Sequence, residues 1–354
     1  NADLGVMISA SHNPMPDNGI KFFAKGGDKL ADSLEAQIEA RLGEPWSRPT
    51  GLDVGRIFTD EGASTRYVNY LLATISTDLA GLKVVVDCAN GASSSVAPLA
   101  YKNAGALVTA ISAAPTGWNI NENCGSTHLE NLIAEVKKIG ADLGVAHDGD
   151  ADRCLLVASN GDVIDGDYIL NILSRSYFDD GKLKKNTVVG TVMSNLGFIK
   201  SMESAGINVE KTAVGDRYVL EKMLENDYVL GGEQSGHIIM RQFSNSGDGL
   251  LTALQIMQVM AKTKQSLLDL SSNMSKYPQV LINVKDVAKE KLASSAKIKQ
   301  AVIDAEKDLA GVGRVLLRAS GTESLVRVMV EANDLQLANK VADSLAQLVR
   351  LELK

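Results

Sequence analysis

The sequence predicts a multidomain α/β protein. At 354 residues, with 45% hydrophobic and 22% charged residues, the chain is long and apolar enough for three or more compact units. Short runs rich in β-branched residues alternate along it with helical patterns, which is typical of α/β folds. Several of these runs end in polar, glycine-bearing loops, and open α/β sheets bind ligands at the carboxyl ends of their strands.

Four expected strands have such a loop at their end. They span residues 82–87, 143–147, 188–193 and 229–230, and the loops contain DCANG, DGD, SN and GGE respectively. We therefore expect the chemistry of the protein to lie in these loops.

The C-terminal part has a different pattern. Strands at 280–284, 315–317 and 325–331 accompany a charged helix and a final helix from Leu335, which indicates a smaller α+β unit. We place boundaries near Thr65, Gly166 and Lys276. The expected domains are residues 1–65, the remainder of a first domain; 66–165 and 166–275, two α/β domains; and 276–354, the α+β domain.

Composition excludes several classes of protein. A net charge of −7 provides no general field for nucleic acid or an anionic membrane. The most apolar stretch, 249–260, is too short to span a bilayer. The three cysteines, Cys88, Cys124 and Cys154, are widely spaced beside small or apolar residues, which favours buried thiols in a reduced, cytoplasmic protein.

The N-terminal segment GVMISASHNPMPDNGIKFF, residues 5–23, places a polar loop between two expected strands. Residues 5–8 form the end of a buried strand, and Asp-Asn-Gly at 17–19 predicts a turn into a strand at 20–23. A secretory leader is excluded by Asp3 and by the polar residues that interrupt the apolar run. Ser11 in this loop is either a turn-forming serine or, when phosphorylated, a source of hard anionic oxygens.

The sequence HDGDADR, residues 147–153, predicts a divalent-cation site. Asp148, Asp150 and Asp152 stand at alternate positions after a strand, so an extended or loosely curled loop brings their carboxylates to one point. Three such carboxylates repel one another unless they bind a cation such as Mg²⁺, whose open positions take water or phosphate oxygens. The alternatives are an EF-hand, which Arg153 and Ser159 at its sixth and twelfth positions exclude, and a solvated acidic turn.

Two further loops carry polar groups beside glycines. In GGEQSGH, residues 231–237, Glu233, Ser235 and His237 favour contact with sugar hydroxyls, although a plain turn with a satisfied histidine is the alternative. In RASGTE, residues 318–323, with Arg327 beyond, two guanidiniums and a glycine-centred nest favour a phosphate; a solvated basic loop is the alternative. Together the four loops describe phosphoryl transfer on a sugar phosphate.

The motifs SASHNP with NGIK, DGDADR, GEQSGH and RASGTE resemble, in order, the four signature loops of the α-D-phosphohexomutases. The resemblance covers essentially the whole chain. The stretch NINENCGSTH, residues 119–128, and the GEQSGH form resemble the bacterial members that act on glucosamine phosphates more than those acting on mannose or glucose phosphates.

The resemblance implies related α/β units around a central cleft, with a small C-terminal α+β domain. It implies conversion of glucosamine 6-phosphate to glucosamine 1-phosphate, toward UDP-N-acetylglucosamine and the cell wall. The implied cofactors are Mg²⁺ and a hexose bisphosphate such as glucosamine 1,6-bisphosphate. The phosphosugar is the expected partner, and a homodimer is compatible with the family.

The family also implies a role for each matching residue. Ser11 would be the phosphoserine and a metal ligand beside Asp148, Asp150 and Asp152, with His12 next to it in the same loop. Lys21 and His237 would be acid/base or positioning residues, and Arg153 would stabilise the transferred phosphate. Glu233 and Ser235 would hold sugar hydroxyls. The non-reacting phosphate would be held by Arg318, Ser320, Gly321, Thr322 and Arg327.

The chain departs from the family pattern in three places. Ser11 lies almost at the start, without an initiator Met, so the sequence is expected to be truncated at its N-terminus. Ala151 and Ser324 stand where many relatives have glycine and proline, which affects loop order more than chemistry. The alternative functions are phosphomannomutase or phosphoglucomutase activity and an inactive phosphosugar-binding fragment.

Overall fold

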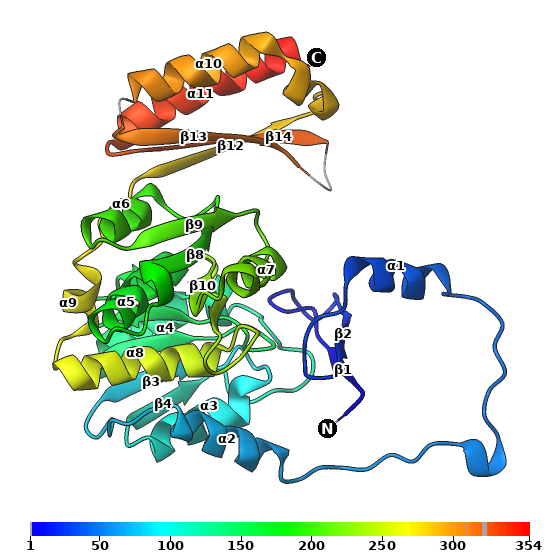
Figure 1. Cartoon of the computed structure of the whole chain (residues 1–354). Coiled ribbons are helices and arrows are strands. Elements are labelled where there is room, and N and C mark those ends of the chain that lie inside the picture. The colour runs from blue at the N-terminus through cyan, green and yellow to red at the C-terminus, as the bar shows by residue number, and fades with distance from the viewer. Residues whose placement is uncertain (1, 310, 321–323) are drawn as a thin grey trace. The chain divides into compact units, whose positions relative to one another are not determined.

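Strands and helices alternate along the chain in a computed structural model that describes residues 2–309, 311–320 and 324–354 (Figure 1). These residues form two compact units. The first extends to Met193 and includes Ala205–Asn273, and the second comprises Ser194–Ser204 and Met274–Lys354. The boundaries proposed from sequence near Thr65, Gly166 and Lys276 stay predictions.

The N-terminal hairpin has the two expected strands, β1 (Leu4–Ile8) and β2 (Ile20–Ala24), which pair antiparallel with Met7 opposite Lys21. The prediction that residues 5–8 are buried is wrong, because Leu4, Val6 and Ile8 are each more than half exposed. The hairpin forms a two-stranded sheet, in which a strand buries alternate side chains at most on one face.

The hairpin is followed by helices and then by a five-stranded sheet in the order β4-β3-β5-β6-β7. The connecting elements are α1 (Asp32–Ala40), the 3₁₀ turn η1 (Gly51–Asp53) and α2 (Ala63–Ala73). The strands are β3 (Lys83–Asp87), β4 (Leu107–Ile111), β5 (Leu143–Ala146), β6 (Leu155–Ala158) and β7 (Val163–Ile164). Other elements of this part are α3 (Ser93–Asn103), η2 (Gly125–Thr127) and α4 (Glu130–Ile139).

The direction of the central strands brings two loops together. β3 and β5 are adjacent and parallel, with Asp87 opposite Ala146 at their carboxyl ends. On one face of the sheet, Leu132 and Val136 of α4 pack against Val85 and Val157 in a buried cluster. The loops that follow β3 and β5 consequently emerge at the same edge, as expected for parallel strands.

A second sheet in the first unit has the order β11-β10-β8-β9. Its strands are β8 (Thr187–Thr191), β9 (Asn208–Thr212), β10 (Leu230–Gly232) and β11 (Ile238–Met240). The accompanying elements are α5 (Gly166–Asp179), η3 (Lys184–Asn186), α7 (Asp216–Asn226), α8 (Gly249–Thr263) and α9 (Leu267–Ser271). The antiparallel hairpin of β10 and β11 presents residues 233–237 at its tip.

The second unit is the expected α+β structure. Its antiparallel sheet has the order β12-β14-β13, formed by β12 (Gln279–Lys285), β13 (Gly313–Ala319) and β14 (Leu325–Ala332). Its helical elements are α6 (Leu196–Ser204), η4 (Lys289–Ser294), α10 (Ala296–Asp308) and α11 (Leu335–Glu352). Helices α10 and α11 cover one face of the sheet, over a core that includes Val284, Val326, Val328 and Val330 (Figure 1).

A buried carboxylate joins α6 to this sheet. Glu331 of β14 is fully buried and accepts hydrogen bonds from Arg314 Nε at 2.7 Å, Leu196 N at 2.9 Å and Asn195 Nδ2 at 3.2 Å. A buried charge with this many partners avoids the cost of an unpaired one. The segment 194–204 therefore belongs with the C-terminal sheet.

Two expectations drawn from composition can be compared with the structure. Cys88, Cys124 and Cys154 are free and buried, as predicted. Within the described ranges, no helix is both long enough and apolar enough to cross a membrane.

Candidate active site

The N-terminal loop places Ser11 directly against the acidic loop. Ser11 Oγ donates a hydrogen bond to Asp148 Oδ2 at 2.8 Å, although the two residues are 137 positions apart. Ser11 adopts a left-handed backbone conformation with φ of 53°, which residues with a Cβ rarely adopt. His12 lies beside it, with Nδ1 at 3.4 Å from Ser11 Oγ.

Ser9 forms a second contact between the two loops. Its Oγ donates to Asp150 Oδ2 at 3.0 Å and accepts from the backbone N–H of Ser11 at 2.8 Å. The hydroxyl therefore fixes Ser11 and also lies against the acidic loop. Ser9 was not predicted from sequence as a site residue.

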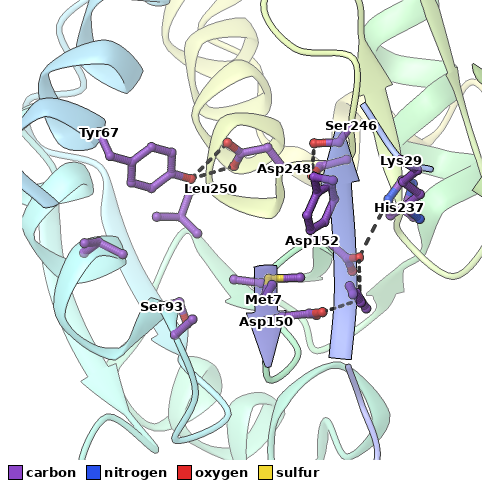
Figure 2. Close-up of a pocket in the computed structure, with 16 residues that line it drawn as sticks. Met7, Lys29, Tyr67, Ser93, Asp150, Asp152, His237, Ser246, Asp248 and Leu250 are labelled. Carbon is purple, nitrogen blue, oxygen red and sulfur yellow. Dashed lines mark hydrogen bonds and ion pairs between the residues drawn. The ribbon is translucent and has the colours of Figure 1, made fainter. Parts of the chain in front are cut away.

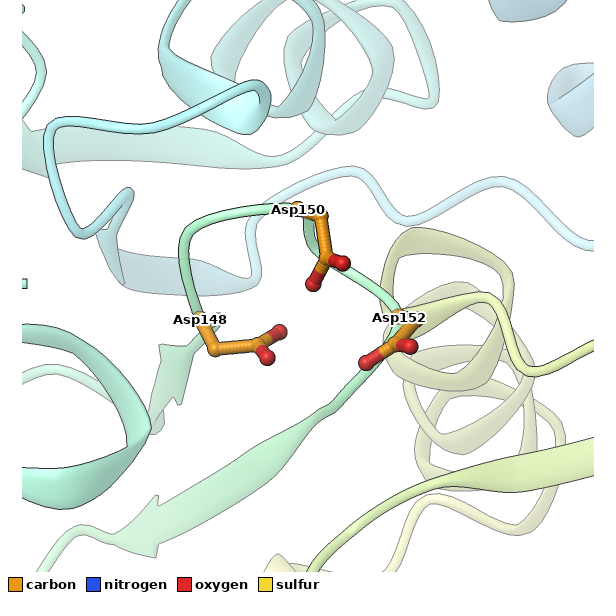
Figure 3. Close-up of side chains that lie close together, drawn as sticks. All are labelled: Asp148, Asp150 and Asp152. Carbon is orange, nitrogen blue, oxygen red and sulfur yellow. The ribbon is translucent and has the colours of Figure 1, made fainter. Parts of the chain in front are cut away.

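The three aspartates converge as predicted. One carboxylate oxygen from each of Asp148, Asp150 and Asp152 lies within 4.8 Å of the others, and the side chains point toward one another (Figure 3). The loop is curled rather than extended, because Ala151 has φ of 61°. Asp150 Oδ1 and Asp152 Oδ1 are buried and have no hydrogen-bond partner among the described residues. Oxygen donors of this kind fit a hard divalent cation such as Mg²⁺.

The pKa values within the triad reflect burial and mutual repulsion. Burial is the main cause that raises the pKa of Asp148 and of Asp152 to about 6, and the charge of Asp150 adds to it at both residues. Burial would also raise the pKa of Asp150, but a hydrogen bond from Lys21 Nζ at 2.6 Å and the lysine charge outweigh it and lower the pKa.

We expect Mg²⁺ to stabilise the chain more at pH 7 than at pH 5. The folded pKa values of Asp148 and Asp152, about 6, exceed the unfolded value of 3.8, so the folded chain binds more protons between these pH values. The metal-free chain therefore loses stability as the pH rises through this window. Because Mg²⁺ competes with the same protons, its stabilising effect should increase with pH.

The measurement is the melting temperature with and without saturating Mg²⁺ at the two pH values. The Mg²⁺-induced rise should be smaller by more than half at pH 5, where a carboxyl with a pKa of about 6 is about nine-tenths protonated. Asp162→Asn, in an exposed turn outside the triad, is the control and should preserve this difference. An equal rise at both pH values would contradict the assignment.

A buried histidine closes the acidic loop. His147 Nδ1 lies 2.9 Å from the carbonyl oxygen of Arg153, and its Nε2 lies 2.8 Å from Tyr101 Oη. Because a carbonyl only accepts, Nδ1 carries the proton and Nε2 accepts from the tyrosine. Burial lowers the pKa of His147 to about 4, which favours this neutral form. His147 thus joins the two ends of the segment that carries the three aspartates.

The predicted sugar loop adjoins the acidic loop. Arg153 and His237 form an antiparallel bridge, and Cys154 N donates to Gly236 O at 3.0 Å. Gly236 has φ of 93°, and a Cβ there would lie 2.4 Å from the carbonyl oxygen of Cys154, so the contact requires glycine. Glu233 Oε1 accepts from Gly215 N at 3.0 Å, and Ser235 is exposed.

His237 lies between two carboxylates. Its Nε2 is 3.5 Å from Asp216 Oδ2 and 3.8 Å from Asp152 Oδ2, and Lys29 pairs with Asp216. Burial lowers the pKa of His237, and the charge of Asp216 opposes this effect. Lys29 and Asp216 were not predicted from sequence, because neither belongs to a motif that indicates chemistry.

A cavity of about 380 Å³ lies beside these groups. Its lining includes Asp150, Asp152 and His237 from the predicted site, together with Tyr67 and Asp248, which hydrogen-bond to each other at 2.9–3.0 Å (Figure 2). Asp248 also caps α8 by accepting from Leu251 N at 2.9 Å. The Tyr67–Asp248 pair therefore anchors the cavity wall to the start of that helix.

The second unit carries the predicted phosphate-binding residues. Arg318 and Arg327 lie directly opposite each other on β13 and β14, on the face away from α10 and α11. Two cations in this register repel each other unless an anion lies between them. Ser320 is buried, and its carbonyl accepts from Lys289 Nζ at 2.7 Å. Gly321 and Thr322 lie outside the described residues.

The first unit thus brings together a serine hydroxyl, a three-carboxylate cluster and several basic side chains. These basic residues are His12, Lys21, Arg153 and His237. Such a set is suited to phosphoryl transfer, which depends on positioning and on neutralising the charge of the phosphoryl group.

Comparison with known proteins agrees with this class. The phosphoglucomutase/phosphomannomutase family models match in four parts: α/β/α domain I at residues 1–46, domain II at 65–161, domain III at 165–277 and the C-terminal domain at 281–348. The chain belongs to this family. It is a phosphohexomutase, an isomerase that relocates a phosphoryl group, with a multidomain α/β fold.

Individual relatives are more specific. The chain is 55% identical over 357 residues to the phosphoglucosamine mutase of Streptomyces griseus, covering 99% of this chain and 79% of that protein. It is 56% identical over 347 residues to the phosphoglucosamine mutase of Rhodococcus jostii, covering 98% of this chain and 78% of that protein.

Solved structures support the fold. A phosphoglucomutase/phosphomannomutase family protein from Burkholderia thailandensis has a TM-score of 0.81 at 21% identity, over 99% of this chain and 78% of that chain. The N-acetylphosphoglucosamine mutase of Aspergillus fumigatus, solved with GlcNAc-6P and magnesium, has a TM-score of 0.76 at 18% identity, over 99% of this chain and 89% of that chain.

Proposed function

We propose that the chain interconverts glucosamine 6-phosphate and glucosamine 1-phosphate through a phosphorylated Ser11. The observation that carries this proposal is the position of the Ser11 hydroxyl, 2.8 Å from a carboxylate of the three-aspartate cluster. The choice of sugar is supported by the phosphoglucosamine mutases that the chain resembles over 98–99% of its length.

The proposed cycle has two transfers. First, the P–O bond to Ser11 Oγ breaks and a P–O bond forms with the free sugar hydroxyl, whose proton leaves to a base. The product, glucosamine 1,6-bisphosphate, then turns end for end. Its other phosphoryl group returns to Ser11 Oγ, and the freed sugar oxygen takes up a proton. The sum is an isomerisation that regenerates phosphorylated Ser11.

The basic residues divide between two tasks in this scheme, offsetting charge and moving a proton. Burial would lower the pKa of Lys21, but the hydrogen bond and charge of Asp150 outweigh it and raise the pKa, so the side chain is a cation that offsets phosphoryl charge. Arg153, whose Nε lies 3.9 Å from Asp148 Oδ2, has the same task. His237, which burial favours in the neutral form, accepts the hydroxyl proton, and His12 contacts Ser11 Oγ.

Asp148, Asp150, Asp152 and the phosphate on Ser11 would hold Mg²⁺. When bound, the cation neutralises charge on the transferring phosphoryl group. Glu233 and Ser235 would hold sugar hydroxyls, and Arg318, Ser320, Gly321, Thr322 and Arg327 would hold the phosphate that does not react. Glucosamine 1,6-bisphosphate, or a similar hexose bisphosphate, serves as intermediate and activator.

Replacing Arg327 should weaken substrate binding more than chemistry. A residue that holds the non-reacting phosphate contributes equally to the ground and transition states, so Arg327→Ala should raise KM more than it lowers kcat. A charge-assisted contact is worth about 1.5–3 kcal/mol, so kcat/KM should fall about ten- to a hundredfold. Arg327→Lys should recover part of this loss, because lysine keeps the charge without the planar fork.

Steady-state kinetics test this assignment. Arg350→Ala is the matched control, because Arg350 is an exposed arginine of the same unit near the end of α11. It should leave KM unchanged. A KM of Arg327→Ala equal to that of the unaltered chain would remove Arg327 from the phosphate site.

Turnover of three sugars tests the proposed substrate. We expect kcat/KM to be highest for glucosamine 6-phosphate among the 6-phosphates of glucosamine, mannose and glucose. A preference for mannose or glucose phosphate would instead support a phosphomannomutase or phosphoglucomutase. If the chain binds a phosphosugar but shows neither turnover nor a phosphate on Ser11, the result would support a phosphosugar-binding fragment.

The cellular compartment of the enzyme is inferred from the use of its product. Glucosamine 1-phosphate leads toward UDP-N-acetylglucosamine and the cell wall, so we place the enzyme in the cytoplasm. Its free cysteines suit that reducing compartment. A homodimer stays a prediction that a measurement of solution mass would test.

A further inference from the structure

Asn121 lies in the loop between β4 and η2 and links that loop to the loop that carries Ser11. Its side-chain nitrogen donates to the carbonyl oxygen of Ser11 at 2.8 Å and to that of Asn13 at 2.9 Å. These two carbonyls flank His12. Both amide hydrogens are thereby used, across sequence separations of 110 and 108 residues. Asn121 is buried, with only 5% of its surface exposed.

Asn121 is itself firmly placed. Its backbone N–H donates to the carbonyl of Ala89 at 2.9 Å, in the loop that follows β3. Its φ is 56°, in the left-handed region that asparagine tolerates better than most residues. The amide group therefore projects from a fixed backbone toward the serine loop.

The acidic loop, which carries the three aspartates, approaches the same point. A Cβ at Gly149 would lie 2.6 Å from the carbonyl oxygen of Ser11 and 2.8 Å from Asn121 Nδ2. Gly149 lies between Asp148 and Asp150, so Asn121, Ser11 and the acidic loop meet where only glycine fits. A shift of the Ser11 carbonyl would change how the serine faces the aspartates.

The hydrogen bonds described between the N-terminal hairpin and the three aspartates use groups that the reaction changes. Ser11 and Ser9 donate to Asp148 and Asp150, and Lys21 donates to Asp150. Phosphorylation of Ser11 removes its hydroxyl proton, and a bound cation takes up carboxylate oxygens. The two bonds from Asn121 involve only backbone carbonyls, so they persist through such changes.

We propose that Asn121 is a positioning residue that holds Ser11 in line with the three aspartates throughout the cycle. This inference rests on the proposed function, because it assumes that Ser11 carries the phosphoryl group. Displacement of a reacting group by about 1 Å can cost on the order of a hundredfold in rate, so loss of these two bonds should affect the chemical step. Binding of the phosphosugar elsewhere in the site should change little.

The test compares Asn121→Asp with Asn123→Asp. The first variant keeps the shape of the side chain but places a carboxylate against two carbonyl oxygens. Asn123 is the matched control, because it lies in the same loop with φ of 51° and is exposed. Asn121→Gly is a second variant, which removes the amide without straining the left-handed backbone.

Two quantities are measured for each variant. One is the rate at which Ser11 acquires phosphate from glucose 1,6-bisphosphate with Mg²⁺, followed by intact mass. The other is the steady-state kcat and KM for glucosamine 6-phosphate. For both Asn121 variants we expect the phosphorylation rate and kcat to fall about ten- to a hundredfold, with KM within about twofold. Asn123→Asp should match the unaltered chain.

The melting temperature of each variant is measured as well, to separate a loss of positioning from a loss of general stability. We expect the Asn121→Gly variant to remain folded, with far-ultraviolet circular dichroism unchanged. Unchanged phosphorylation rate and kcat in both Asn121 variants would overturn the inference, as would a loss of equal size in Asn123→Asp. If the unaltered chain acquires no phosphate at all on Ser11, the proposed function itself fails.

Discussion

Ser11→Ala should abolish mutase turnover and leave the fold intact. The Ser11 hydroxyl lies 2.8 Å from Asp148 and is the nucleophile of the proposed cycle, so its removal eliminates both transfers. The side chain is half-buried in a loop, and loss of its hydrogen bond should change the free energy of unfolding by about 1 kcal/mol or less. Turnover with a hexose bisphosphate present and thermal unfolding together measure the two effects.

Ser9→Ala is the informative comparison. Ser9 also lies against the aspartates, at 3.0 Å from Asp150, but its hydroxyl already accepts the N–H of Ser11. We expect this variant to turn over more slowly yet still to acquire phosphate on Ser11. If Ser11→Ala turns over as fast as the unaltered chain, Ser11 is not the nucleophile.

Asp150→Asn should lower activity by orders of magnitude. Asp150 accepts from Lys21 at 2.6 Å and from Ser9 at 3.0 Å, so it organises the site as well as offering a ligand oxygen to Mg²⁺. A neutral amide at position 150 weakens Mg²⁺ binding and the hydrogen bond with Lys21. The transition state therefore loses charge neutralisation. The measurements are kcat/KM against Mg²⁺ concentration and Mg²⁺ binding by calorimetry.

The matched control is Asp162→Asn, an aspartate of the exposed turn between β6 and β7. It should have the activity and Mg²⁺ dependence of the unaltered chain. Full activity of Asp150→Asn at limiting Mg²⁺ would mean that the three aspartates do not form the metal site.

Local patterns made much of the fold predictable. Strands β3, β5 and β8 lie where apolar runs ended in polar loops, because burial of a parallel strand is recorded in its own sequence. The convergence of Asp148, Asp150 and Asp152 followed from their spacing alone. Which of the two expected conformations the loop adopts, extended or curled, did not follow, since alanine rarely adopts the positive φ that Ala151 has in the curled loop.

Contacts between distant loops were not predictable in the same way. The bonds of Ser9 to Asp150 and of Asn121 to Ser11 depend on how separate elements pack, although both residues lie in stretches whose motifs were recognised. Asp216 beside His237 has no local signal at all. The exposure of β1 was missed for a related reason: its apolar run indicates a strand, but burial depends on what packs against that strand.

Phosphate mapping on Ser11 tests the central claim most directly. The chain is incubated with glucosamine 1,6-bisphosphate and Mg²⁺, and its phosphorylated peptide is identified by mass spectrometry before and after addition of glucosamine 6-phosphate. We predict a single phosphate, located on Ser11. When that phosphate is isotopically labelled and excess bisphosphate is removed, addition of unlabelled glucosamine 6-phosphate should move the label to the sugar, while Ser11 regains an unlabelled phosphate. Turnover by a chain that carries no phosphate on Ser11, or that carries it on another residue, would contradict the account.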